Sequence, residues 1–137
     1  MTKTELLRRK LQQLDEYLGF LEQIKEKPKE LFLNEPQMWA STERFLQMAL
    51  EVINDMGSHV IADENLGTVE QYRDIPKIFA EQNWIDVDIK RLWIKMIGFR
   101  NLLVHGYATV DRSEVYSILQ NNLDDIKKIK KVFLRFL

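Results

Sequence analysis

Residues 87–105 read VDIKRLWIKMIGFRNLLVH, and this stretch decides the fold. Its large apolar residues recur every three or four positions, a spacing that puts them on one face of a helix. These residues are Ile89, Leu92, Met96, Phe99 and Leu103. The pattern predicts a helix, opened by Asp86 or Asp88, whose apolar face belongs to the core of an all-α protein.

Polar residues interrupt a second apolar stripe of the same helix, which is formed by Trp93, Ile97 and Val104. Arg100 lies in the middle of this stripe, where a guanidinium needs a carboxylate, a phosphate or a subunit boundary. Asn101 and His105 are four residues apart and share a helical face, whereas Arg100 and His105 are about 140° apart on an ideal helix. One straight helix therefore does not bring Arg100 and His105 together.

Convergence of Arg100 and His105 requires either a helix end near Gly106 or a copy of the same helix from a second subunit. We favour the second subunit, because a twofold axis through this face would also explain the apolar residues around the polar cluster. A lone histidine on an apolar face is usually structural. Arg, Asn, His and Tyr within eight residues favour a functional site instead, since each would need its own buried partner.

The rest of the chain has helical spacing wherever the spacing is regular, and this predicts a single antiparallel bundle of about five helices over residues 1–137. Besides the helix with Arg100, the predicted helices cover residues 4–24, 37–62, 69–82 and 114–136. One face of the first helix is expected in the core, and it consists of Leu7, Leu11, Leu14, Leu18 and Leu21.

Helix start and break signals refine these boundaries. Thr68 is the predicted N-cap of the third helix, with Gln71 as its capping-box partner. Pro76 predicts a kink or interruption of that helix near Ile75. Asp111 or Ser113 is expected to open the last helix, and Pro28 and Pro36 delimit a break after the first.

Composition limits the possible chemistry. The 137 residues include no cysteine and only two histidines, so we expect no disulfide framework, no thiolate site, no metal and no cofactor. The net charge of −1 argues against coating nucleic acid by bulk electrostatics, although a local basic cleft is compatible with it. No apolar run approaches the roughly 20 residues of a membrane span, and the N-terminus lacks the apolar core of a signal peptide, so a cytoplasmic location is expected.

The spacing Arg100, four residues, His105, one residue, Tyr107 matches the R-x-x-x-x-H-x-Y signature of HepT-like toxins in the HEPN superfamily, which the chain resembles. The similarity extends through residues 43–47, 55–62 and 115–120. The resemblance implies an all-helical, dimeric ribonuclease toxin whose paired motifs form one composite cleft. It also implies a partner, a minimal nucleotidyltransferase antitoxin of the MntA type, which attaches AMP groups to Tyr107 and silences the toxin.

The motif residues suit metal-independent cleavage of RNA. RNA carries its own nucleophile, the ribose 2′-OH, so such an enzyme needs a proton acceptor, a proton donor and a cation at the transition state. His105 is the expected acid or base, one role for each chain of a dimer, and Arg100 the expected phosphate ligand. Asn101 either supports this site, by orienting the imidazole or donating to the phosphate, or bridges two chains structurally, with equal weight. Tyr107 is expected to stack on a base or contact phosphate.

Other charged residues have supporting or structural interpretations. Arg91 and Lys95, together with Lys90, precede Arg100 by one or more turns and are expected to guide an RNA backbone into the cleft. A second basic cluster is expected to be mainly a solvated face, with RNA contact as the lesser alternative. It comprises Lys127, Lys128, Lys130, Lys131 and Arg135.

Three residues of the second predicted helix have open roles. Asp55 and His59 are expected to form an ordinary surface pair four residues apart rather than a catalytic pair. Glu43 has two interpretations: it neutralises Arg100 when RNA is absent, or it makes a structural pair, which is favoured.

Two classes of function remain. The first is a metal-independent endoribonuclease toxin, neutralised by modification of Tyr107. The alternative is a non-catalytic helical module that binds a nucleotidyltransferase and presents Tyr107 or a nucleotide to it, because a buried Arg and His also bind a phosphate without cleaving it. The expected partners are RNA, the nucleotidyltransferase and a second copy of the chain, with no membrane or DNA. Activity on RNA separates the two classes.

Overall fold

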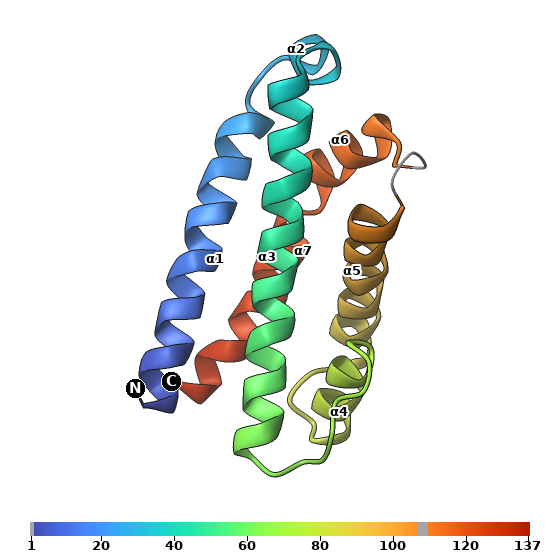
Figure 1. Cartoon of the computed structure of the whole chain (residues 1–137). Coiled ribbons are helices and arrows are strands. Elements are labelled where there is room, and N and C mark those ends of the chain that lie inside the picture. Colours follow the sequence, from blue (N-terminus) through green and yellow to red (C-terminus); the bar gives the residue numbers. More distant parts are fainter. Residues whose placement is uncertain (1, 107–109) are drawn as a thin grey trace.

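The computed structural model describes residues 2–106 and 110–137, and the sequence expectation of an all-α fold is confirmed over these residues. Long helices run the length of the molecule, short helices lie at its two ends, and the C-terminal helices cross behind the long ones (Figure 1). The elements are α1 (Lys3–Lys25), α2 (Lys29–Asn34), α3 (Pro36–Asp63), α4 (Asp74–Glu81), α5 (Val87–His105), α6 (Arg112–Asn121), α7 (Leu123–Val132) and the 3₁₀ helix η2 (Phe133–Phe136).

The helices α1 and α3 form an antiparallel pair, and the other helices pack around it (Figure 1). A capping box starts α1, because Thr2 Oγ1 accepts from the Glu5 amide at 3.1 Å and Glu5 Oε2 accepts from the Thr2 amide at 2.9 Å. The predicted leucine face of α1 is buried along its whole length, which confirms it as core. Pro36 occupies the first position of α3, where its missing N–H interrupts no hydrogen bond.

An aromatic cluster joins α4, α5 and η2 at the end of the molecule that holds both termini. The Phe79 and Trp93 ring centroids are 5.0 Å apart, and those of Trp93 and Phe133 are 5.7 Å apart, both in edge-to-face geometry. Gly57 lets α4 approach α3, since a Cβ at this position would lie 2.5 Å from Ile75 Cγ2. These contacts fix α4, and with it the segment that connects α3 to α4.

The prediction for the third helix was wrong in its boundaries. The helix begins at Asp74 rather than at residue 69, and Thr68 does not cap it. Instead, the Asp74 carboxylate accepts from the amides of Glu70 and Gln71 at 3.1 and 3.0 Å and holds the segment before the helix as a turn. Pro76 is then the third residue of α4, within the first turn, where no amide needs an intrahelical partner. The expected kink is therefore unnecessary.

The helix count also differs from the predicted five, because the described residues form seven α-helices. The short α2 lies between Pro28 and Pro36, and the predicted last helix breaks at Asn122, whose side chain donates to Asp125 Oδ2 at 2.7 Å. Asp86 and Asp111 are the observed N-caps of α5 and α6. In the part of the chain that the structure describes, no helix is long and apolar enough to span a membrane.

Candidate functional site

Arg100 is the centre of the candidate site, and it points from α5 toward α3. Its Nε and Nη2 atoms both donate to Glu51 Oε1, at 3.2 and 2.9 Å, and Nη1 donates to Asn101 Oδ1 at 3.3 Å. The side chain of Arg100 is 15% exposed. The Tyr72 ring packs on the guanidinium, with 5.1 Å from Arg100 Cζ to the ring centroid. The carboxylate that Arg100 requires is therefore supplied by Glu51.

The contacts of Arg100 leave it able to bind an anion. A guanidinium carries five N–H donors, and three of them make the hydrogen bonds described above. The remaining two can donate to a phosphate while Glu51 holds the plane of the group. Glu51 thus neutralises Arg100 when no anion is bound and orients it for one that arrives.

Glu43 does not neutralise Arg100, because Glu51 takes that place, and its alternative role in a structural pair stays a prediction. Glu43 lies eight residues before Glu51, about 12 Å along α3, where the charge of Arg112 acts on it. Burial raises the pKa of the Glu43 carboxyl above its ordinary value, and the charge of Arg112 opposes this only in part. Arg112 in turn packs on the Trp39 ring at 4.1 Å and donates to the Leu33 carbonyl at 3.2 Å.

His105 and Asn101 are both exposed, on the outward face of α5. His105 is the last residue of α5, and the amide of Gly106 donates to the Leu102 carbonyl at 2.7 Å as the helix ends. Arg100, in contrast, is half-buried against α3. A single chain therefore presents Arg100 and His105 to different sides. Tyr107, the third motif residue, lies outside the described residues.

The outward face of α5 carries the residues expected to guide RNA. We call this face the open side and define it by Arg91, Lys95, Asn101 and His105, all of which are exposed. Among the salt bridges of the described chain, none involves Arg91 or Lys95. Both cations are available to an anionic ligand.

Several basic residues on α1 or facing it are paired with carboxylates. Lys127 Nζ lies 2.6 Å from Glu22 Oε1, and Lys130 forms a salt bridge with Asp15, so both link α7 to α1. Lys10 Nζ lies 2.8 Å from Asp55 Oδ2. The expected Asp55–His59 pair was therefore wrong, because a lysine on the neighbouring helix competes for the carboxylate. These three salt bridges connect α1 to α3 and α7. We call the surface formed by Lys10, Lys127 and Lys130 with their carboxylate partners the closed side.

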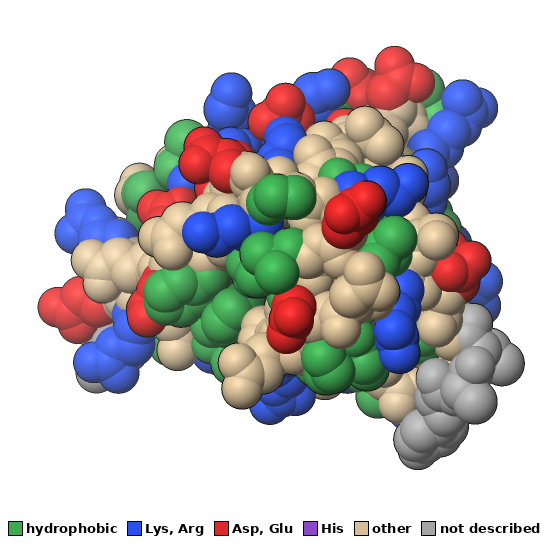
Figure 2. Space-filling model, turned by 90° about the horizontal axis from the view of Figure 1, so that it is seen from above, with side chains coloured by type: hydrophobic (Ala, Val, Ile, Leu, Met, Phe, Trp, Pro, Cys, Tyr) green, Lys and Arg blue, Asp and Glu red, His purple; other side chains and the backbone are tan. Residues whose placement is uncertain are grey.

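Figure 2 looks down on the end of the molecule opposite the two termini, where α2 lies. Basic and acidic side chains alternate around apolar ones on this face, without one continuous basic surface. On this face, charges of both signs are therefore mixed, in keeping with the net charge of −1. Within residues 2–106 and 110–137, no three His, Cys, Asp or Glu side chains form a group that could hold a metal ion.

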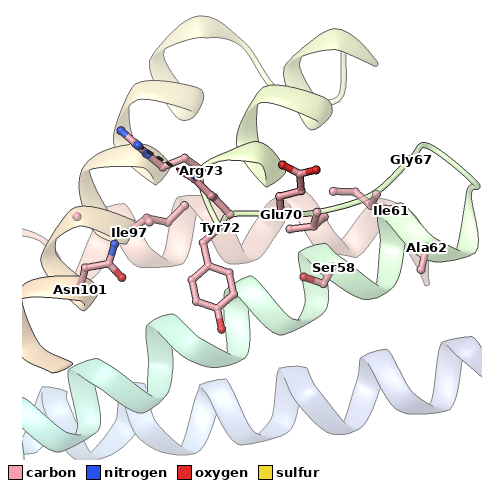
Figure 3. A pocket seen from close by; sticks show the side chains of 12 residues that line it. Ser58, Ile61, Ala62, Gly67, Glu70, Tyr72, Arg73, Ile97 and Asn101 are labelled. Carbon is pink, nitrogen blue, oxygen red and sulfur yellow. Dashed lines mark hydrogen bonds between the residues drawn. The ribbon is translucent and has the colours of Figure 1, made fainter. Parts of the chain in front are cut away.

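Two hollows lie near Arg100, which lines the smaller one and reaches the larger one through its contacts Tyr72 and Asn101. The larger, of about 740 Å³, lies between α3, the segment that precedes α4, and α5 (Figure 3). It is lined by Ser58, Ile61, Ala62, Gly67, Val69, Glu70, Gln71, Tyr72, Arg73, Ile97, Gly98 and Asn101. The smaller, of about 340 Å³, lies against α1 and α3 and includes Arg44, Glu51 and Arg100. Tyr72 borders both hollows, because it stands between α3 and α5.

Sequence reasoning missed Glu51 and Tyr72. The signal for Glu51 was a carboxylate inside the apolar run from Met48 to Ile53, where a charge needs a partner. Tyr72 gave no comparable signal, since it falls in a segment that was predicted as helix. Of the predicted residues, the structure joins Arg100 to Asn101 and leaves Arg91, Lys95 and His105 at the surface.

The helical bundle and a half-buried arginine beside an exposed histidine define a class of all-α protein with a polar site on one central helix. A family model described as Ribonuclease HepT-like matches residues 11–133. The chain belongs to this HepT-like family, as the sequence resemblance indicated. A curated relative from Shewanella oneidensis, described as mRNA nuclease HepT, is 29% identical over 83 residues, which span 61% of this chain and 62% of the relative. The match thus covers less than two thirds of that relative.

Solved structures agree with the fold. A Shewanella oneidensis structure described as a tri-AMPylated HEPN toxin in complex with an MNT antitoxin superposes with a TM-score of 0.87 at 22% identity, covering 98% of this chain and 99% of the other. A cytosolic Bacillus subtilis protein of unknown function, YutE, superposes with a TM-score of 0.72 at 20% identity, covering 90% and 87%. At these identities the likeness establishes the HEPN fold.

Proposed function

We propose that this chain is the metal-independent endoribonuclease toxin of a HepT/MntA-type toxin–antitoxin pair. The observation that carries the proposal is the motif geometry: Arg100 is held by Glu51 with N–H groups to spare, and His105 is exposed five residues later on the same helix. Membership of a family named for a ribonuclease supports it, as does a relative described as an mRNA nuclease. In this proposal the chain acts in the cytoplasm.

The proposed site is composite and lies between two copies of the chain. The open side of α5 suits a twofold contact, because Gly98 leaves open space at the position of a Cβ, and Ile94 and Leu102 beside it are only half-buried. Such a contact would bring the His105 imidazoles of two protomers near each other and near the Arg100 groups. A twofold contact would thus bring Arg100 and His105 together although they are separated within one chain.

The reaction would use one imidazole as base and the other as acid. His105 of one protomer accepts the proton of the ribose 2′-OH as O2′ attacks the phosphorus, and His105 of the other protomer donates a proton to the departing O5′. The products are a 2′,3′-cyclic phosphate and a 5′-OH. Arg100 stabilises the charge that develops on the non-bridging oxygens, and Asn101 fixes the guanidinium or donates to phosphate. Arg91 and Lys95 hold the flanking backbone.

Control of the toxin would come from a nucleotidyltransferase antitoxin of the MntA type that attaches AMP to Tyr107. The comparison structure described as tri-AMPylated and bound to an MNT antitoxin supports this part of the proposal. Tyr107 follows His105 by two residues, so AMP there adds bulk and negative charge beside the site and repels an RNA phosphate. Protein modified by the antitoxin with ATP should lose cleavage, and Tyr107→Phe should resist modification. Cleavage by the modified protein at the unmodified rate would contradict this control.

The activity is tested by incubating labelled RNA with purified protein in the presence of EDTA. The wild type should cleave and leave cyclic or 3′-phosphate ends, whereas His105→Ala should not. His59→Ala is the matched control, because His59 is the other histidine of the chain and is also exposed, but on α3. Absence of cleavage by unmodified wild type across messenger and transfer RNA would favour the alternative, a non-catalytic subunit that binds the nucleotidyltransferase.

A further inference from the structure

The larger hollow beside Arg100 has no role in the proposed reaction. It opens between α3 and α5 under the segment that precedes α4, and its wall includes Asn101, the hydrogen-bond partner of Arg100 (Figure 3). Its volume of about 740 Å³ is within the range of ligand pockets, roughly 300–1,000 Å³. Arg100 does not line this cavity itself, but two of its contacts, Tyr72 and Asn101, do, so a phosphate on Arg100 would lie one side chain away from it.

The walls combine an aromatic ring with apolar surface. Tyr72 is 38% exposed although its ring packs on Arg100, and it projects into the space between α3 and α5. Ile61 and Ile97, which are both buried in the core, form the floor behind the ring. Aromatic side chains are the usual platform on which proteins stack unpaired bases, and every base has a face to stack.

Polar groups face the same space from both helices. Ser58 extends from α3 and Asn101 from α5 toward the surroundings of Tyr72 (Figure 3). The Ser58 hydroxyl donates and accepts, and it makes no side-chain hydrogen bond in the described chain. Asn101 uses its oxygen for Arg100, which leaves its NH₂ group to donate. These are the groups that hydrogen-bond the edge of a base.

The position of the segment that carries Tyr72 is fixed before any ligand binds. Asp74 accepts from the Glu70 and Gln71 amides, and Ile75 is buried against Gly57. A preformed wall loses less conformational entropy on binding than a mobile one. The cavity is thus a fixed part of the fold.

We propose that this cavity is a nucleobase subsite that receives one base of the bound RNA next to the phosphate on Arg100, with Tyr72 as stacking platform and Ser58 and Asn101 as edge contacts. The proposal rests on RNA being the substrate. It assigns the choice of cleavage position partly to a base held between α3 and α5.

The test measures binding, so it does not depend on cleavage. Short RNA oligonucleotides with 2′-O-methyl groups throughout lack the nucleophilic hydroxyl, and an abasic residue is moved through them one position at a time. Their affinity is measured by fluorescence anisotropy for the wild type and for Ser58→Leu, which replaces the proposed polar edge contact by a bulkier apolar side chain. Ser41→Leu is the control, because Ser41 is a half-buried serine of the same helix that borders a different hollow.

At one position, loss of the base should weaken binding to the wild type and to Ser41→Leu about tenfold, the size of a lost stacking contact. The same loss should change binding to Ser58→Leu less than twofold, since the leucine blocks the place of the base beside Tyr72 and removes its edge contact. Tyr72→Leu, which keeps bulk without an aromatic face, should behave like Ser58→Leu. If one of the variants Ser58→Leu and Tyr72→Leu fails to fold, the other is sufficient for the test.

Equal losses in wild type and Ser58→Leu, or no sensitive position at all, would overturn the subsite. Cleavage by the wild type is measured in parallel on an oligonucleotide of the same sequence that keeps its 2′-hydroxyl groups and all its bases. Cleavage without a sensitive position would reject the subsite alone, whereas a sensitive position without cleavage would support the subsite and reject the ribonuclease.

Discussion

The closed side and the open side of the molecule treat positive charge differently. On the closed side, Lys10, Lys127 and Lys130 each face a carboxylate of a neighbouring helix. On the open side, Arg91 and Lys95 have no such partner in the described chain, and the nearby Arg100 keeps N–H groups beyond those that Glu51 accepts. Paired surface cations help to join helices and contribute little else. The comparison shows two uses of positive charge: paired cations join α1 to its neighbours, whereas the cations of α5 are left for a ligand, which in the proposed function is RNA.

The largest expected effect is on the open side, from Arg100→Ala. Loss of a group that stabilises the transition state typically lowers kcat about 100- to 1,000-fold. The variant leaves the Glu51 carboxylate without its cation, which destabilises the fold by itself. The double variant Arg100→Ala with Glu51→Gln removes that charge and should be equally inactive at saturating RNA. Activity within tenfold of wild type in the folded double variant would contradict the role of Arg100.

A packing contact behind the open side should give the next largest effect. In Gly57→Ala the new Cβ meets Ile75 Cγ2 at 2.5 Å, and a β-branched side chain has little freedom to move away. We expect a loss of about 1–3 kcal/mol in the free energy of unfolding. Gly19→Ala in α1 meets nothing within 4 Å and should instead gain about 0.5–1 kcal/mol. Urea denaturation measures both, and a change of the same sign in the two variants would refute the contact.

A smaller, local effect is expected at the turn before α4. Hydrogen bonds from the Gln71 and Glu70 amides, aided by Lys77 and Arg73, lower the pKa of Asp74 below its ordinary 3.8 against a weaker effect of burial. A carboxyl with a lowered folded pKa stabilises the fold above its unfolded pKa, and this contribution disappears as pH falls through the folded value. Hydrogen-exchange protection of the Glu70 and Gln71 amides should therefore decrease at acidic pH. In Asp74→Ala that protection should be low at every pH; equal protection in both proteins would contradict this.

The smallest effect is expected from Glu43→Gln. Glu43 belongs to neither the open side nor the closed side. Burial, which outweighs Arg112, raises the folded pKa of Glu43 above its ordinary 4.5. Its contribution is fully present below the unfolded pKa and is lost as pH rises through the folded pKa. The glutamine should thus raise Tm by about 1–3 °C at pH 7 and not at pH 4. Glu16→Gln, at an exposed position of α1, should change neither value. A gain that is the same at both pH values would rule out this origin.

Local signals in the sequence were sufficient for the fold class and for much of its detail. The leucine face of α1 and the caps Asp86 and Asp111 depend on neighbours within one or two turns, and the structure has them as predicted. The third helix was misplaced because Thr68 resembled an N-cap. In the structure, the Asp74 carboxylate instead accepts from the Glu70 and Gln71 amides and holds these residues in a turn before the helix. The break at Asn122 was missed because the apolar spacing continues across it, through Leu119, Leu123 and Ile126.

The site was predicted less completely, because its contacts join distant parts of the chain. Arg100 was recognised as a cation that needs a partner, but Glu51 lies 49 residues away and Glu43 fitted the pattern as well. Spacing on one helix gives the angle between Arg100 and His105 and contains no information about a second copy. The catalytic assignment, the dimer and the role of Tyr107 stay predictions.

The most direct test compares two double variants, each of which removes two positive charges from one side of the molecule. Arg91→Gln with Lys95→Gln changes the open side by two charges, and Lys127→Gln with Lys130→Gln changes the closed side by the same amount. Cleavage of one RNA at low salt, with EDTA, gives kcat/KM for each folded protein. The account predicts a loss of at least tenfold for the open-side variant and less than twofold for the closed-side variant; equal losses, or a larger loss on the closed side, would contradict it.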